Sequence, residues 1–271
     1  MKFGFVLPYG DAATAADLAR IAEDSGWDGF FVWEPVWGID AWVCLTAAAM
    51  TTSTIRLGTM LTPASRMRPW KLASEAATLD NLSGGRVILA VGLGAIDTGF
   101  AEFGEETDRR TRAELLDESL EIVTGLWAGQ PFGYEGKHYM VKPLAGMPPP
   151  PPPVQRPRIP IWVVGAWGHP KSMERALKYD GILAQVKKGE EFPAVTPEVV
   201  AAVRHHAAEH RDTPIDLIVE GSTGGDPAAD SAKLESLAAA GATWWIEGMW
   251  DAQNDLVRVR ERVLEGPLAA T

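Results

Sequence analysis

Short apolar runs alternate with segments of helical periodicity along the whole chain. The apolar runs are rich in Val, Ile, Phe and Trp and show little polar alternation, which is typical of parallel strands covered by helices. They predict eight strands, at residues 2–7, 29–33, 55–61, 87–92, 159–165, 181–186, 216–221 and 243–248. Between them, segments such as TAADLARIAEDSG and RAELLDESLEIVTGLW place apolar residues on one stripe of a helix.

This strand–helix repeat favours an α/β fold, a (β/α)8 TIM barrel in which residues 1–271 form a single domain. An open doubly wound sheet is the alternative. Residues 129–158 interrupt the alternation of strands and helices before the fifth strand. They contain FGYEGKHYMV, which indicates a short hairpin, and a run of six prolines that predicts surface polyproline II. By chain order this surface insertion lies on the N-terminal face, as a stiff connection or as a docking motif.

The composition and charge of the chain disfavour several classes of function. A formal net charge of −11 disfavours a nucleic-acid partner, because phosphate binding requires a clustered positive field. The single cysteine, Cys44, permits no intrachain disulfide. No apolar run reaches the length of a membrane span, and the opening MKFGFVLPYG is not a signal peptide, so we expect a cytoplasmic protein with no membrane partner.

In a barrel, function belongs to the loops that follow the carboxyl ends of the strands. Four tryptophans fall in these loops: Trp33, Trp37, Trp167 and Trp250. Aromatic side chains with a few polar groups suit a flat conjugated ring, although they could equally cap the barrel. Helical VAAVRHHAAEHR places its histidines (His205, His206 and His210) mostly on the polar side, and no HExxH, CxxC or GxSxG motif is present, so no metal site is predicted.

Two glycine-containing turns could bind a phosphate. The turn after the fifth strand, Gly165-Ala166-Trp167-Gly168-His169-Pro170-Lys171, opens a helix whose free N–H groups and dipole favour an anion. A plain tight turn is the alternative. The second turn, residues 222–226, ranks lower because Asp226 reads as a helix N-cap and would repel an anion.

The segment LGTMLTPASRMRPWKLASEAATLDNLSGGRVILAVGLG resembles the core signature of the luciferase-like flavin or deazaflavin oxidoreductases. RAELLDESLEIVTGLW, VQRPRIPIWVVG and ATWWIEG are similar to smaller members of that superfamily, so the resemblance covers nearly the whole chain. It implies FMN or coenzyme F420 as cofactor and a small-molecule substrate. It also implies a homodimer paired through helices beside the second and third strands, where AWVCLTAAAM is apolar over much of its circumference.

The resemblance also places the cofactor. Gly165, Ala166, Trp167, Gly168, His169 and Lys171 resemble the family's G-x-G-P-K phosphate turn, with His169 as a departure. Trp33 and Glu34 end the second strand, and by barrel geometry we expect both to point into the mouth where the ring should lie. Gly92 and Gly94 fail the dinucleotide motif because Asp97 replaces its third glycine, and in the family they let backbone approach the ring. Thr59-Met60-Leu61-Thr62 occupies the position of a bulge with a non-prolyl cis peptide, placed at Met60-Leu61.

Glu34 is the candidate catalytic residue. It stands at the end of the second strand, where sugar-phosphate dehydrogenases of the deazaflavin branch carry an acid followed by a histidine base. Here Pro35 follows, so that dehydrogenase activity is not expected. Glu34 either hydrogen-bonds the ring or substrate in the mouth or is a solvated loop acid. We therefore predict hydride transfer or monooxygenation on a small, largely apolar substrate. A non-catalytic flavin-binding barrel is the alternative, and a metal-dependent hydrolase is disfavoured.

Overall fold

The computed structural model describes residues 1–144, 146, 149–189, 191–252 and 254–268. Its main sheet is a closed barrel of parallel strands. The strands are β1 (Lys2–Leu7), β2 (Gly29–Val32), β3 (Arg56–Thr59), β4 (Thr62–Pro63), β5 (Val87–Gly92), β8 (Ile161–Trp167), β9 (Gly181–Val186), β10 (Asp216–Gly221) and β11 (Trp244–Gly248). The pairing of β3 with β5 closes the sheet, and β3 and β4 are two parts of one barrel strand. The predicted (β/α)8 barrel is confirmed.

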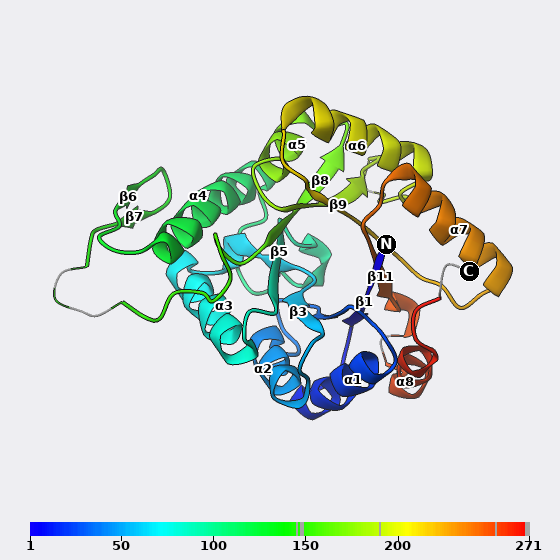
Figure 1. Ribbon diagram of the computed structural model, residues 1–271. Coiled ribbons are helices and arrows are strands. Elements are labelled where there is room, and N and C mark those ends of the chain that lie inside the picture. Colours follow the sequence, from blue (N-terminus) through cyan, green and yellow to red (C-terminus); the bar gives the residue numbers. More distant parts are fainter. Residues whose placement is uncertain (145, 147–148, 190, 253, 269–271) are drawn as a thin grey trace.

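Helices form a ring around these strands (Figure 1). They are α1 (Ala12–Asp24), α2 (Ala41–Thr51), α3 (Pro69–Ser83), α4 (Arg109–Ala128), α5 (Pro170–Ala176), α6 (Pro197–His210), α7 (Pro227–Ala240) and α8 (Leu256–Glu265). Aspartate side chains begin several of them, and Asp226 does so at α7, as predicted. Gly84 and Gly241 end α3 and α7 in the left-handed conformation.

Several strand boundaries differ from the prediction by one or two residues, and two of these differences change the mouth of the barrel. The third strand is interrupted at Met60 and Leu61 instead of running to residue 61. The fifth strand, β8, begins and ends two residues later than predicted, so Ala166 and Trp167 belong to the strand and not to the loop.

Three large aromatic rings fill the N-terminal half of the barrel. Phe31 and Trp162 stack with centroids 5.5 Å apart, and Trp244 packs edge-on against Trp162 at 5.1 Å. The inward positions beside them are glycines, at which a Cβ would come within 3.0 Å of the Phe31 or Trp162 ring: Gly4, Gly29, Gly58 and Gly181. Large rings opposite small residues close this end of the barrel. The site must therefore lie at the opposite, C-terminal end.

The predicted hairpin in the insertion is present, as the antiparallel pair β6 (Tyr134–Glu135) and β7 (Met140–Val141), which projects beside α4 (Figure 1). The end of the proline run is fixed to the N-terminal face, as predicted. Asn81 donates to the carbonyl of Pro152, and the buried carboxylate of Asp80 accepts from the amides of Val154 and Gln155. Residues 147–148, where the run begins, lie outside the described residues.

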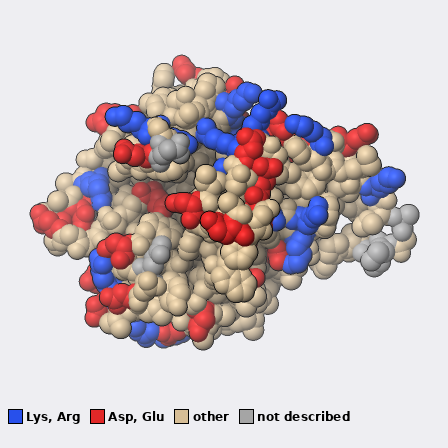
Figure 2. All heavy atoms as spheres, turned by 180° about the vertical axis from the view of Figure 1, so that it is seen from behind, with Lys and Arg blue, Asp and Glu red and all other residues tan. Residues whose placement is uncertain are grey.

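Helix α2 packs between α1 and α3, and most of its apolar side chains are buried. Val43 and Met50 remain exposed on its outer side. The predicted pairing of two copies through this helix stays a prediction. On the face drawn in Figure 2, Lys and Arg side chains lie among Asp and Glu side chains. Within the described part of the chain, no helix is both long enough and apolar enough to cross a membrane.

Candidate active site

The top layer of the barrel is set by strand alternation. Inward side chains follow every second residue, so Glu220 shares a face with the lumenal Ile218, and Gln185 with Leu183. By the same alternation the top layer comprises Trp33, Gly92, Ala166, Gln185, Glu220 and Gly248. At Gly92 and Gly248 the absence of a side chain lets neighbouring side chains approach the mouth, because a Cβ there would come within 3.0 Å of Val164 and Leu61 or of Trp250.

The four tryptophans expected around the mouth do not all lie there. Trp33 and Trp250 meet edge to face at the mouth, with centroids 5.8 Å apart. Trp37 stacks on Phe103 and is 83% exposed. Trp167 packs against His206 of α6 at 5.9 Å, on the outer side of the barrel. Because β8 continues to residue 167, Ala166 faces inward and Trp167 faces outward, so the expectation that Trp167 lines the mouth is wrong.

The peptide between Met60 and Leu61 is cis, as the sequence resemblance predicted. Met60 is buried in the lumenal cluster, and Leu61 packs against it. Thr59 and Thr62, on either side of this bulge, are fully buried. The bulge thus gives one side of the mouth an apolar surface backed by two hydroxyl groups.

Gly92 and Gly94 hold backbone close to this bulge. A Cβ on Gly92 would lie 2.9 Å from Val164 and 3.0 Å from Leu61. Gly94 has a φ of +77°, which favours glycine, and Arg112 donates to the carbonyls of Leu93 and Gly94 at 2.8 and 3.2 Å. At this edge of the mouth the backbone therefore carries no side chain at the two glycines and is held in place by Arg112.

Glu34 is not a solvated loop acid, because only 9% of it is exposed. It does not share the inward face of Trp33 either, because consecutive strand residues point to opposite sides. Its Oε2 lies 2.5 Å from Thr62 Oγ1 in the wall behind the bulge. The expectation that both Trp33 and Glu34 face the mouth is therefore correct only for Trp33.

Two hydroxyl groups connect Glu34 to the neighbouring strand. Thr62 Oγ1 donates to Glu34 Oε2 and also lies 2.9 Å from Thr59 Oγ1, which donates to the carbonyl oxygen of Ala90 at 3.1 Å. The chain of contacts therefore runs from Glu34 through both threonines to Ala90.

Burial has the largest effect on the protonation of Glu34. Burial raises the pKa of Glu34 to about 7, against the opposing effects of the Thr62 hydrogen bond and the positive charge of Arg66. Glu75 and Asp40 add a smaller upward contribution to this pKa. Arg66 itself is held by the carbonyls of Pro35 and Val36, at 3.0 and 3.2 Å.

Glu220 is a second acid of the mouth, which the sequence analysis did not single out. It is exposed to solvent, although many protein atoms lie near its carboxyl group. Burial raises its pKa, against the effect of the Trp250 indole N–H, which donates to Oε1 at 2.5 Å. Alternation from Ile218 was the signal that could have placed Glu220 inward.

The two candidate phosphate turns differ in what their amides already bind. In the turn at residues 222–226, the Asp230 carboxylate accepts from the amides of Gly224 and Gly225, and Glu247 accepts from that of Thr223. In the described structure, no carboxylate accepts from an amide of residues 165–171. At Gly168, φ is +83° and a Cβ would meet nothing within 4 Å, so space beside this turn is open.

Within the same turn, Gly165 has a packing role, because a Cβ there would come 2.5 Å from Ile182 and 3.2 Å from Met173 of α5. Ser172 binds the strand end to the helix, since its hydroxyl accepts from the Ala166 amide and donates to the Val164 carbonyl. His169 and Lys171 lie at the start of α5. The predicted residues thus form one turn, in which Gly165 and Trp167 face away from the mouth.

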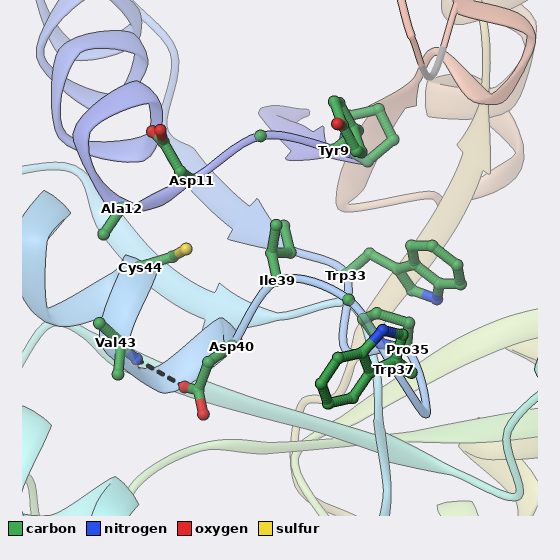
Figure 3. A pocket seen from close by; sticks show the side chains of 13 residues that line it. Tyr9, Asp11, Ala12, Trp33, Pro35, Trp37, Ile39, Asp40, Val43 and Cys44 are labelled. Carbon is green, nitrogen blue, oxygen red and sulfur yellow. Dashed lines mark hydrogen bonds between the residues drawn. The ribbon is translucent and has the colours of Figure 1, made fainter. Parts of the chain in front are cut away.

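A cavity of about 490 Å³ adjoins Trp33 between the loops that follow β1 and β2 (Figure 3). Its walls are mostly apolar and include Tyr9, Trp37, Ile39 and Val43. Cys44 also lines it, and burial raises the pKa of this thiol to about 11, so it is no nucleophile at neutral pH. The volume is that of a small-molecule pocket.

The closed barrel with its interrupted third strand and aromatic mouth was then compared with proteins of known family. The model of the luciferase-like monooxygenase family matches residues 1–263, so the chain belongs to that family.

The chain is 31% identical over 215 residues to the F420-dependent glucose-6-phosphate dehydrogenase of Amycolatopsis mediterranei, a match that covers 76% of this chain and 62% of the relative. The structure of monooxygenase RslO1 from Streptomyces bottropensis superposes with a TM-score of 0.78 at 22% identity, over 97% of this chain and 96% of the other.

The FMN complex of the oxygenating constituent of 3,6-diketocamphane monooxygenase, from the CAM plasmid of Pseudomonas putida, superposes with a TM-score of 0.65 at 20% identity. That match covers 98% of this chain and 78% of the other. FMN and F420 therefore both occur among the proteins that this chain resembles, in agreement with the pair of cofactors expected from the sequence.

Proposed function

We propose that this chain is an oxidoreductase that binds FMN or coenzyme F420 in the mouth of the barrel. The observation that carries the proposal is the meeting of Trp33, which borders a cavity of about 490 Å³, with the apolar Met60-Leu61 bulge at the top of the lumenal cluster. A flat ring needs such apolar faces and a few hydrogen-bonding groups at its edge. When bound, the cofactor supplies the hydride or oxygen chemistry, and the protein supplies orientation and a dry pocket.

The residues present fit such a group. Gln185 and Glu220 offer polar side chains at the mouth, and the backbone of residues 92–94 lies bare beside the bulge. The turn at residues 165–171 would hold the phosphate, because space is open beside Gly168 and Lys171 adds a positive charge, while the amides of Ala166 and His169 bind within the turn. The turn at residues 222–226 lacks this capacity, since its amides already bind Asp230 and Glu247.

Glu34 acts on the site through another residue. Its carboxyl group accepts a hydrogen bond from Thr62 and thereby anchors the bulge on which the ring would lie. It is therefore a positioning residue, in contrast to the catalytic role expected from the sequence. The substrate would occupy the apolar cavity beside Trp33, which favours a small and largely apolar molecule.

Purification from a host that makes both FMN and F420, followed by absorbance and fluorescence spectra, tests the proposal. We expect one of the two cofactors to copurify. Oxidation of the reduced cofactor by added acceptors then distinguishes an enzyme from a non-catalytic flavin-binding barrel. Absence of binding to either cofactor would refute the proposal.

Replacement of Gly168 with Val is expected to weaken cofactor binding about 10-fold or more, which is about 1.4 kcal/mol. The added side chain would fill the open space beside the turn and oppose its left-handed backbone. Gly224→Val is the matched control, because Gly224 also has positive φ and an unobstructed Cβ position but lies in the other turn. Dissociation constants from fluorescence titration compare the two. Equal effects would remove residues 165–171 from the phosphate site.

Replacement of Trp33 with Ala is expected to weaken cofactor binding by about 1 kcal/mol or more, because the ring would lose a large aromatic contact. Trp37→Ala removes a tryptophan of the same loop that is 83% exposed, and it should leave the affinity near the wild-type value. The same titration measures both variants. An unchanged affinity in Trp33→Ala would show that the cofactor does not lie against this side of the mouth.

A further inference from the structure

The last turn of α6 brings two imidazoles and a carboxylate together on the surface. His206 and His210 are one helical turn apart, with ring centroids separated by 4.1 Å. The ligand atoms of His206, Glu209 and His210 all lie within 4.8 Å of one another. Imidazole and carboxylate are the ligand types that Zn²⁺ and neighbouring first-row ions accept. This cluster lies outside the mouth of the barrel and takes no part in the cofactor site described above.

The histidine nearest the helix end is already in the tautomer that a metal requires. His210 Nδ1 lies 2.8 Å from the carbonyl oxygen of His206. That oxygen can only accept, so Nδ1 carries the proton and Nε2 keeps a free lone pair. A hydrogen bond from the other ring nitrogen is the usual way in which metal-binding histidines are oriented.

The local field also favours a cation. α6 ends at His210, so the cluster lies at the negative end of the helix dipole. Glu209 adds a negative charge, and its present partner is the exposed His205 at 3.3 Å, a contact that costs little to break. The nearby Arg204 and Arg211 bind backbone carbonyl groups, including those of Ile215 and Leu177.

We propose that His206, Glu209 and His210 form a binding site for a divalent transition-metal ion such as Zn²⁺. Bond lengths of about 2.0–2.2 Å require ligand atoms about 3–4 Å apart, which rotation of these surface side chains can reach. Water completes the coordination. The His206 ring also packs against Trp167, so a bound ion would fix the outer side of the turn at residues 165–171.

Isothermal titration of untagged protein with ZnCl₂ tests the site. We expect saturable binding of one ion, weakened about 10-fold or more in His206→Ala and in His210→Ala. His205→Ala is the matched control, because His205 lies on the same helix but outside the three ligands, and it should bind Zn²⁺ at least as well as the wild type. Circular dichroism without metal checks that every variant keeps its fold. Absence of saturable binding, or equal affinity in all three variants, overturns the proposal.

Tryptophan fluorescence gives an independent reading of the place of binding. Cu²⁺ at the site should quench Trp167, which touches His206, and Trp167→Phe should remove that part of the quenching while leaving the Zn²⁺ affinity within about 3-fold of the wild type. Quenching of the same size in Trp167→Phe would place the ion elsewhere and overturn the assignment.

Discussion

The Glu34→Gln variant is expected to become more stable than the wild-type chain as the pH rises from about 4.5 to about 7. In the folded chain, burial holds the pKa of Glu34 at about 7, whereas an unfolded glutamate titrates near 4.5. Between these values the unfolded state has released a proton that the folded state retains. The wild type therefore loses stability over this range, and glutamine, which has no proton to lose, does not.

The full separation of the two pKa values corresponds to about 3 kcal/mol. Urea denaturation of both proteins at a series of pH values measures it as the change in their difference in unfolding free energy, which removes the contribution of all other titrating groups. Glu220→Gln is the comparison variant, because Glu220 is reached by water and should show a smaller effect. A difference between wild type and Glu34→Gln that is constant from pH 4 to pH 8 would contradict a neutral Glu34 in the folded chain.

The fold could be predicted because the strands are mostly apolar runs bounded by helical periodicity. Every predicted barrel strand is present, and the resemblance to the luciferase-like family placed the cis peptide at Met60-Leu61. Such predictions depend on properties of ten or more residues at once. They tolerate an error of one or two residues at a boundary.

Side-chain direction does not tolerate that error. A strand end misplaced by two residues put Trp167 in a loop, and the structure instead gives it the outward side of β8. The predicted direction of the Glu34 side chain is wrong for a similar reason. Trp33 points inward, so the residue after it points into the barrel wall. A shift of a single residue reverses the face of a strand.

Contacts between distant segments are the other limit. The partner of Glu34 lies 28 residues further along the chain, and nothing local to either residue indicates the pair. Two features could have been predicted from the sequence pattern. Strand alternation places Glu220 on the inward face, and helical spacing places His206 and His210 side by side. The largely apolar composition of the strand and the polar composition of the helix conceal them.

Replacement of Thr62 with Val is expected to raise the pKa of Glu34 further, by roughly 1 unit. The Thr62 hydroxyl stabilises the charged form of the carboxyl group through a contact of 2.5 Å, and Val has nearly the same shape without a hydroxyl. One hydrogen bond is worth about 1 kcal/mol, which sets the size of the change. The carbonyl stretch of a protonated carboxyl group in infrared difference spectra, absent from Glu34→Gln, measures the midpoint directly.

Thr62→Ser is the control for this prediction. Serine keeps the hydroxyl and with it the chain from Glu34 to the Ala90 carbonyl, so its midpoint should stay near that of the wild type. Valine should also destabilise the protein by about 1–3 kcal/mol at all pH values, because the Glu34 carboxyl group loses its buried partner. If the midpoint instead fell in Thr62→Val, or moved equally in Thr62→Ser, the hydroxyl chain would not control the protonation of Glu34. The cofactor-side bulge would then be held by packing of Met60 and Leu61 alone.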